Sequence, residues 1–258
     1  MGISLKSSAE IEIMRKACHI QSKILNEVGA AVCAGISTGK LDDFAEQLCR
    51  EHNVKPAFKG YGGFPATICA SVNDKVVHGI PSHKEVLQSG DIIAIDFGVI
   101  LDGFYADACQ TFCVGEVSDS AQKLIERTRE SLYRGIEQAR VGNRLGDIGF
   151  AIQSFTESFG YAPVRETVGH GIGRKLHEFP EVPNWGTAGQ GIKLVANMTI
   201  CIEPIINAGT PEIITEADGW TTRTADGELS AHFEHQILIR EEGTEILTNW
   251  DKNSHNHA

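Results

Sequence analysis

The stretch "SGDIIAIDFGVILDGFYADACQTFCVG" (residues 89–115) decides the fold, because two apolar runs in it flank the dipeptide Asp102-Gly103. Asp-Gly between two β-forming runs is a strong signal for a two-residue hairpin turn. With such a turn Leu101 lies opposite Phe104, and the register of both strands is fixed. The sequence therefore predicts a long antiparallel hairpin.

The hairpin brings two aspartates to one face of the sheet. In this register Asp107 lies opposite Gly98, and Asp96 lies two residues from Gly98 on the same face. We expect Gly98 to leave room between the two carboxylates. Because carboxylates in apolar surroundings repel each other and lose hydration, this pair predicts a shared proton or a bound cation. The alternative is a solvated sheet face, on which alternating polar residues are common.

Helices and further strands surround the hairpin. Ser7 and Glu10 predict a capping box at the start of the first helix, whose apolar residues recur at helical spacing as far as Val32. The remaining periodic segments are helices at 40–52, 118–139 and 145–159 and strands at 67–72 and 92–100. This mixture predicts an α+β fold.

The two halves of the chain resemble each other. Three pairs of segments correspond, namely "GKLDDFA" (39–45) with "NRLGDIG" (143–149), "VHGIP" (77–81) with "GHGIG" (169–173), and "DIIAID" (91–96) with "MTICIE" (198–203). Each half is expected to supply a His-Gly-Ile loop and then a strand that ends in a carboxylate. The pattern predicts a duplicated domain with its site between the halves.

A second candidate segment is "ETVGHGIGRKLHEFPEVPNW" (166–185), with three glycines around a histidine. A phosphate-binding loop would open onto a helix, but the prolines that follow prevent one. His170 is therefore a candidate metal ligand, together with Glu203 and Glu234, which are charges among β-forming residues. With Asp96 and Asp107 they form a mostly oxygen set with one imidazole, which suits two divalent ions of manganese, iron, cobalt or zinc.

Familiar catalytic motifs are otherwise lacking. "DFG" at 96–98 has no accompanying kinase motifs, and "HEFPE" at 177–181 lacks the second histidine of an H-E-x-x-H zinc site. No G-x-S-x-G nucleophile motif occurs.

Composition limits the class of protein. The 34 acidic and 23 basic residues give a net charge of -11, which argues against a broad nucleic-acid surface. Seven cysteines without a C-x-x-C pair favour a reducing cytoplasm. No apolar run approaches the ~18 residues of a membrane span, and no signal peptide is visible. The tail "SHNHA" is expected to be a short disordered end.

The chain resembles the type I methionine aminopeptidases, in their short bacterial form, over nearly its whole length. The segments that carry the resemblance are "GYGGFPATICASVNDKVVHGIP" (60–81), "DIIAIDFGVILDGFYADACQTF" (91–112), "TVGHGIGRKLHEFPEVPN" (167–184), "CIEPII" (201–206) and "DGWTTRTADGELSAHFEHQILI" (218–239). The resemblance implies the pita-bread (creatinase/aminopeptidase) fold, in which an antiparallel sheet flanked by helices forms two pseudo-symmetric halves. These would be about 1–115 and 116–250 of a single catalytic domain over 1–258.

The resemblance also implies the roles of individual residues. The metal ligands would be Asp96, Asp107, His170, Glu203 and Glu234, with Asp107 and Glu234 bridging two divalent ions. The residues at the scissile bond would be His78, His177 and Glu203. The methionine pocket would draw on Tyr61, Phe64, Cys69 and Trp220, with Leu176 and Ile205 beside it. Phe64 stands where some members have tyrosine and Phe58 where some have cysteine, which affects the shape of that pocket.

The implied reaction is removal of the initiator methionine from nascent proteins and peptides that have a small second residue, with a metal-bridged hydroxide attacking the first peptide bond. A monovalent cation near Asn73 and Ser230, transient contact with the ribosome, and a cytoplasmic monomer without membrane or direct nucleic-acid binding are further implications.

Three alternatives remain beside this interpretation. A prolidase or aminopeptidase P has the same ligands but usually an extra N-terminal domain, for which the chain leaves no room before its first ligand motif. A type II methionine aminopeptidase would carry a helical insert, for which the interval between His177 and Glu203 is short. A non-catalytic pita-bread binding module is expected to have lost ligands, whereas all five are present here.

Overall fold

The predicted hairpin is the centre of the first sheet. In the computed structural model, which describes residues 2–250, β4 (Ile92–Leu101) and β5 (Phe104–Cys113) pair antiparallel. Leu101 lies opposite Phe104 and Gly98 opposite Asp107, so the predicted register is confirmed. The turn residues Asp102 and Gly103 have φ of 49° and 79°, and two positive φ values in succession are typical of a type I′ turn.

Four antiparallel sheets make up the strand layer. The first has the order β1-β4-β2, with β5 also paired to β4, and the others have the orders β15-β14-β9-β7-β8, β13-β10-β6 and β11-β12-β3. The bounds are β1 Lys55–Pro56, β2 Ile68–Val72, β3 Lys75–Val77, β6 Ala162–Pro163, β7 Gly169–Gly171, β8 Glu178–Val182, β9 Thr199–Ile202, β10 Ile205–Asn207, β11 Ile213–Thr215, β12 Thr222–Thr224, β13 Ser230–His232, β14 His235–Arg240 and β15 Gly243–Ile246.

The helices begin within two residues of their predicted starts. The first, α1 (Ser8–Ala30), has the capping box between Ser7 and Glu10, as predicted. Its buried face includes Met14 and Leu25, and burial of a side chain of that size contributes about 1.5–3 kcal/mol. The other helices are α2 (Thr38–Glu51), α3 (Asp119–Gln138) and α4 (Leu145–Glu157), with a short 3₁₀ turn, η1, at Tyr61–Gly63.

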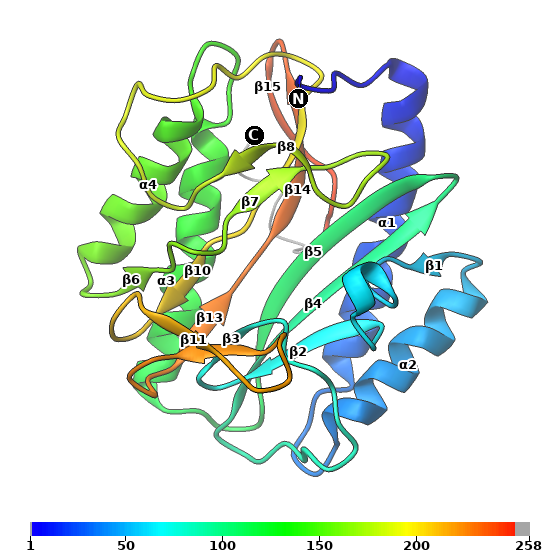
Figure 1. The fold of residues 1–258 in the computed structure, drawn as a ribbon, viewed down its shortest axis with the longest axis vertical. Helices are drawn as coiled ribbons and strands as arrows, with labels where there is room; N and C mark the ends of the chain where they lie inside the picture. The colour runs from blue at the N-terminus through cyan, green and yellow to red at the C-terminus, as the bar shows by residue number, and fades with distance from the viewer. Residues whose placement is uncertain (1, 251–258) are drawn as a thin grey trace.

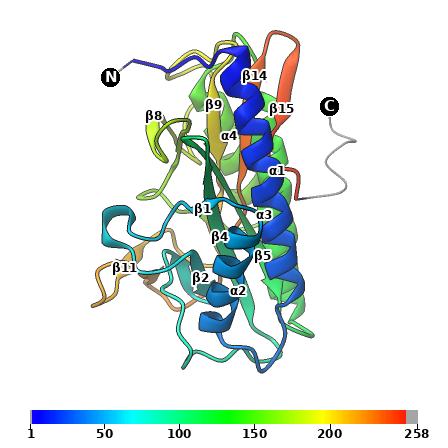
Figure 2. The ribbon, with the colours of Figure 1, turned by 90° about the vertical axis from the view of Figure 1, so that its right-hand side faces the viewer.

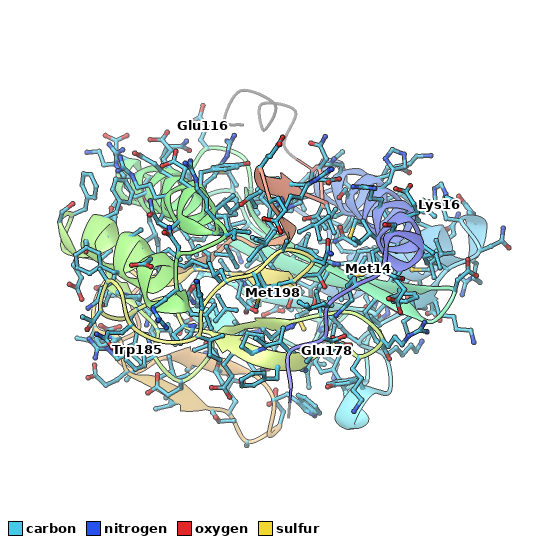
Figure 3. The ribbon with its side chains drawn as sticks, turned by 90° about the horizontal axis from the view of Figure 1, so that it is seen from above. Met14, Lys16, Glu116, Glu178, Trp185 and Met198 are labelled. Carbon is cyan, nitrogen blue, oxygen red and sulfur yellow. The ribbon has the colours of Figure 1, made fainter. Side chains whose placement is uncertain are left out.

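The helices flank the strands in two pairs. Figure 1 shows α1 and α2 on one side of the central strands and α3 and α4 on the other. Turned by 90°, Figure 2 shows α1 and α3 on the right-hand side of the molecule, whereas β8 and β11 lie on the left-hand side. From above (Figure 3), Met14 and Met198 lie toward the middle, where both are buried, and Lys16 and Glu116 lie at the periphery. The predicted α+β arrangement, antiparallel sheet with flanking helices, is confirmed.

Equivalent placements recur in the two halves. Ser37, directly before α2, forms an isolated bridge with Val86, and Arg144, directly before α4, forms one with Lys193. These helix starts are the segments "GKLDDFA" and "NRLGDIG" that resemble each other in the sequence. The limits of the halves, about 1–115 and 116–250, stay a prediction.

One expectation from the repeat is wrong. His170 does not lie in a loop but in β7, whose residues pair with β8 on one side and β9 on the other. The segment that follows, with its prolines, forms β8 at the edge of this sheet, where Pro180 removes a donor that the interior would need. His78, in contrast, follows β3 in an irregular segment, as expected.

A single large apolar core joins elements from both halves, including Met14 of α1, Phe97 of β4, Ile148 of α4 and Ile237 of β14. Within residues 2–250 we find no helix with the length and apolar character needed to span a membrane. The predicted disordered tail concerns residues outside the described range.

Candidate metal centre

Three carboxylates converge where the two large sheets meet. Asp96 of β4, Asp107 of β5 and Glu234, between β13 and β14, each have an oxygen within 4.8 Å of an oxygen of the others. Asp107 and Glu234 are buried and Asp96 is half-buried. The prediction that both hairpin aspartates share a face is confirmed, and the alternative of a solvated face is excluded.

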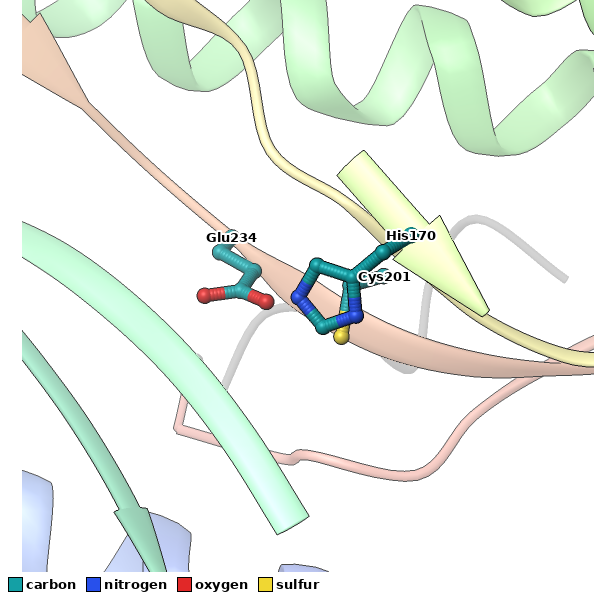
Figure 4. Close-up of side chains that lie close together, drawn as sticks. All are labelled: His170, Cys201 and Glu234. Carbon is teal, nitrogen blue, oxygen red and sulfur yellow. The ribbon is translucent and has the colours of Figure 1, made fainter. Parts of the chain in front are cut away.

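His170 faces the same cluster from β7. Figure 4 shows that its ring, the carboxylate of Glu234 and the thiol of Cys201 on β9 point toward one another, with donor atoms within 4.8 Å. His170 Nε2 lies 3.5 Å from Glu203 Oε1 and 4.0 Å from Asp107 Oδ2. Its Nδ1 lies 2.9 Å from the carbonyl oxygen of Gly171, which assigns the proton to Nδ1. The lone pair of Nε2 is therefore directed into the carboxylate cluster.

The charges of this cluster are not balanced by neighbouring protein groups. Asp96 Oδ1, Asp107 Oδ1 and Glu234 Oε1 are buried without a hydrogen-bond partner in the described part of the chain. Unpartnered buried carboxylate oxygens are costly unless protons or cations neutralise them. Oxygen donors with one imidazole are the ligand set of divalent ions such as manganese, iron or cobalt, so the residues present fit a divalent metal.

Burial governs protonation in this cluster. It raises the pKa of Asp96 to about 7. Burial and then the neighbouring carboxylates raise the pKa of Asp107, Glu203 and Glu234 well above the usual range. For His170, burial and then nearby His177 lower the pKa to about 3. Without cations these groups would share protons, and a cation would release them.

Two further histidines lie at the open side of the cluster. The ring of His177 packs edge-on against His170, with centroids 4.4 Å apart, and its Nδ1 lies 2.9 Å from the hydroxyl of Tyr61. His78 packs edge-on against Trp220 at 6.3 Å. Burial lowers the pKa of both histidines, so each is a neutral donor and acceptor near pH 7.

Aromatic and thiol side chains lie next to these histidines and the carboxylates. The rings of Phe64 and Trp220 meet edge-on at 5.3 Å, and Phe64 is buried. Cys69 of β2 is paired in the sheet with Asp96, which brings its buried thiol beside the carboxylates. All four residues predicted for the pocket, Tyr61, Phe64, Cys69 and Trp220, thus contact the histidines or carboxylates or one another.

The metallopeptidase family M24 model matches residues 12–241. The chain belongs to this family. It is 50% identical to a methionine aminopeptidase of Clostridium acetobutylicum over 246 residues, 95% of this chain and 98% of that relative. It superimposes on the crystal structure of methionine aminopeptidase from Rickettsia prowazekii with a TM-score of 0.94 and 41% identity, covering 96% of this chain and all of that one. The predicted pita-bread fold and the resemblance are confirmed.

A prolidase of Pyrococcus horikoshii has the same fold, with a TM-score of 0.79 at 22% identity. The alignment covers 96% of this chain but 64% of the prolidase. Membership of family M24 makes this chain a metal-dependent hydrolase that binds divalent ions. Between His177 and Glu203 this chain forms the strands β8 and β9 and no helix. A type II methionine aminopeptidase is expected to carry a helical insert in this interval.

Glycines on both sides of His170 let the neighbouring strands approach closely around this histidine. A Cβ on Gly169 would lie 2.3 Å from the carbonyl oxygen of Cys201, and one on Gly171 would lie 2.6 Å from that of Phe179. Atoms at such separations overlap, so only glycine permits the neighbouring strands to approach. The glycines of this segment therefore serve backbone packing rather than phosphate binding.

We expect Gly169→Ala to destabilise the protein by about 1–3 kcal/mol or more, because the added methyl group overlaps a backbone oxygen that cannot move alone. Urea unfolding of the metal-free protein would measure the change. Gly2→Ala is the matched control, since a Cβ there meets nothing within 4 Å. An unchanged unfolding free energy for Gly169→Ala would contradict this account of the segment.

The expectation that Gly98 leaves room between the aspartates stays a prediction, but the packing around Gly98 itself requires glycine. A Cβ at Gly98 would lie 2.9 Å from the side chain of Ala57 and 3.1 Å from the ring of Phe58. These side chains therefore occupy the space. Phe58, where some family members have cysteine, thus packs beside the hairpin that carries Asp96 and Asp107.

The residues predicted to lie near a monovalent cation are neighbours. The backbone N–H of Ser230 donates to the carbonyl oxygen of Asn73 at 2.9 Å. The side chain of Asn73 is already engaged, because its Oδ1 accepts from Ile92 N at 3.0 Å and its Nδ2 donates to Asp91 at 2.9 Å. The cation itself stays a prediction.

Two residues near the carboxylate cluster were not predicted from the sequence. Cys201 and His232 are both buried and face the ligands, Cys201 toward Glu234 and His232 toward Glu203. The only signal in the sequence was that each residue lies two positions before a candidate ligand, since alternate residues of a strand share a face. That signal applies to both, as Cys201 precedes Glu203 and His232 precedes Glu234 by two.

Proposed function

We propose that this chain removes the N-terminal methionine from peptides and nascent proteins, with a preference for a small second residue. The observation that carries the proposal is the convergence of Asp96, Asp107, Glu234 and His170, with unpartnered buried oxygens, near the aromatic pair of Phe64 and Trp220. The names of the relatives that match almost the whole chain support the same activity.

The metal ligands would be Asp96, Asp107, His170, Glu203 and Glu234, with Asp107 and Glu234 shared by two ions. Bound divalent ions would lower the pKa of a water molecule, so that it can attack near neutral pH, and would polarise the carbonyl group of the first peptide bond.

The chain's own residues would move the protons. A carboxylate oxygen of Glu203 would accept a proton from the attacking water and deliver it to the leaving nitrogen. If the Tyr61 hydroxyl donates to Nδ1 of His177, the proton of that ring stays on Nε2. Nε2 of His177 and a ring N–H of His78 are then available to donate to the peptide group.

Selectivity would come from the pocket wall. Phe64, Cys69 and Trp220 offer aromatic and thiol surface, which suits an unbranched thioether side chain. Burial of Phe64 and Cys69 excludes water from the side chain that enters. A shallow pocket next to the scissile bond would admit only a small second residue.

The test is hydrolysis of Met-Gly-X and Xaa-Pro-Y peptides by chelator-treated protein, before and after addition of cobalt, manganese or iron(II). We expect metal-dependent release of methionine from Met-Gly-X alone, and the most effective ion would narrow the choice of metal. Release from Xaa-Pro-Y would assign the chain to the proline peptidases that share its fold. No release with any of the ions would favour a non-catalytic binding module.

Several finer expectations belong to the same proposal and are supported by the family resemblance. They are two ions rather than one, their identity as cobalt, manganese, iron(II) or zinc, a monovalent cation near Asn73 and Ser230, a monomeric cytoplasmic enzyme, and transient contact with the ribosome.

A further inference from the structure

His232 is a buried histidine at the end of β13 whose backbone is clamped to the central hairpin. Its N–H donates to the hydroxyl oxygen of Thr111 at 3.0 Å, and that hydroxyl donates to the carbonyl oxygen of His232 at 2.8 Å. The thiol of Cys109 lies 3.7 Å from the same carbonyl oxygen. Hydrogen bonds from β5 therefore hold the backbone from which the imidazole extends.

The imidazole of His232 lies near the carboxylate of Glu203. Nε2 of His232 lies 3.8 Å from Oε2 of Glu203, whereas Nε2 of His170 lies 3.5 Å from Oε1. Each oxygen of Glu203 therefore faces a different histidine. The side chain of His232 is 3% exposed, and its Nε2 has no hydrogen-bond partner within residues 2–250.

An unpartnered nitrogen in this position needs an acceptor, and Glu203 offers one. At 3.8 Å the two atoms are farther apart than the 2.7–3.2 Å of an N–H···O hydrogen bond. Contacts of this kind often tighten when an active site is loaded. The carboxylate of Glu203, as a proposed metal ligand, would offer Oε2 as a charged and therefore stronger acceptor.

We propose that His232 is a positioning residue of the metal centre, whose Nε2–H donates to Oε2 of Glu203 and thereby fixes the plane of that carboxylate. The inference rests on the proposed function, because it assumes that Glu203 binds a divalent ion. A hydrogen bond from a residue that does not itself bind the metal orients the ligand that does, and its loss commonly changes metal affinity by about 10–100-fold. His232 would act through Glu203 and would touch neither metal nor substrate.

The experiment compares cobalt(II) binding by the metal-free wild type and the variants His232→Leu and His232→Gln, using calorimetry and the visible spectrum of the cobalt-loaded protein. Leucine removes the donor, whereas the amide of glutamine supplies one. We expect His232→Leu to weaken one of two binding steps by about 10–100-fold and to alter the cobalt absorption bands. His232→Gln should restore most of the affinity and the spectrum. His19→Leu, which removes an exposed histidine, is the control for adventitious binding.

Wild-type affinity and spectrum in a folded His232→Leu, with wild-type protein that binds two ions and releases methionine, would overturn this inference alone. Wild-type protein that binds no divalent ion would overturn the metal centre and this inference together. If His232→Leu does not fold, nitrogen-15 NMR of histidine-labelled wild type decides. Zinc loading should leave the proton of His232 on Nε2, and a proton on Nδ1 or a metal-shifted Nε2 signal would overturn the proposal.

Discussion

Replacing Asp107 with asparagine is expected to reduce methionine release by about 10³-fold or more, because a proposed metal ligand is lost and metals supply several kcal/mol of transition-state stabilisation. Asparagine keeps the shape of the side chain and the backbone N–H of residue 107 that donates to Gln236 at 3.1 Å. The fold should therefore persist. The measurements are kcat/KM with a Met-Gly-X peptide and the number of divalent ions bound.

The same variant should be at least as stable as the wild type when both are free of metal. Burial and the neighbouring carboxylates raise the pKa of Asp107, so the folded state binds more protons than the unfolded state above the ordinary pKa. The unfolding free energy of the wild type then falls as the pH rises, and Asp107→Asn lacks this contribution. Its advantage in melting temperature should grow from pH 5 to pH 8 in the presence of a chelator.

Asp102→Asn is the matched control for both measurements. Asp102 lies in the turn of the same hairpin, is exposed, and has a φ of 49° that asparagine tolerates. It should keep activity and stability. Near-normal turnover in Asp107→Asn, or a metal-free variant much less stable than the wild type at pH 8, would contradict the proposal that Asp107 is a metal ligand whose buried charge no protein group neutralises.

The hairpin shows how much local sequence can determine. Asp102-Gly103 sets the turn, the turn sets the register, and the register brings Asp96 and Asp107 to one face. Each step depends on neighbours in the chain, so the prediction needed no tertiary information. The capping box at Ser7 and Glu10 was predictable for the same reason.

Contacts between distant segments were not predictable in this way. The space beside Gly98 is filled by Phe58 from a segment before β2, and periodicity within β4 carries no information about it. His170 lies in a strand because it pairs with β8 and the next residue, Gly171, pairs with β9, whereas its own glycines favour a loop. His232 faces Glu203 only because β13 is clamped to Thr111. The family resemblance, and not the spacing of the residues, implied that the five candidate ligands act together as one set.

His78→Ala is expected to lower turnover by about 10²–10⁴-fold while metal binding stays unchanged, because a positioned donor to the reacting group is lost and no ligand is removed. The backbone positions this ring closely. His78 has a φ of 56°, and a Cβ on Gly79 would lie 2.2 Å from the carbonyl oxygen of Ala70, so the segment can pass β2 only with glycine there. The side chain itself meets Trp220, at the wall of the pocket.

The effect should appear mainly in kcat for a Met-Gly-X peptide, since a donor that acts on the developing charge is used most in the transition state. His83→Ala is the control, because His83 lies in the same connection between β3 and β4 but is exposed, and its Nε2 lies 3.6 Å from a carboxylate oxygen of the equally exposed Asp43. It should behave as the wild type. A rise in KM with normal kcat in His78→Ala would assign His78 to substrate binding, and lost metal in that variant would place it among the ligands instead.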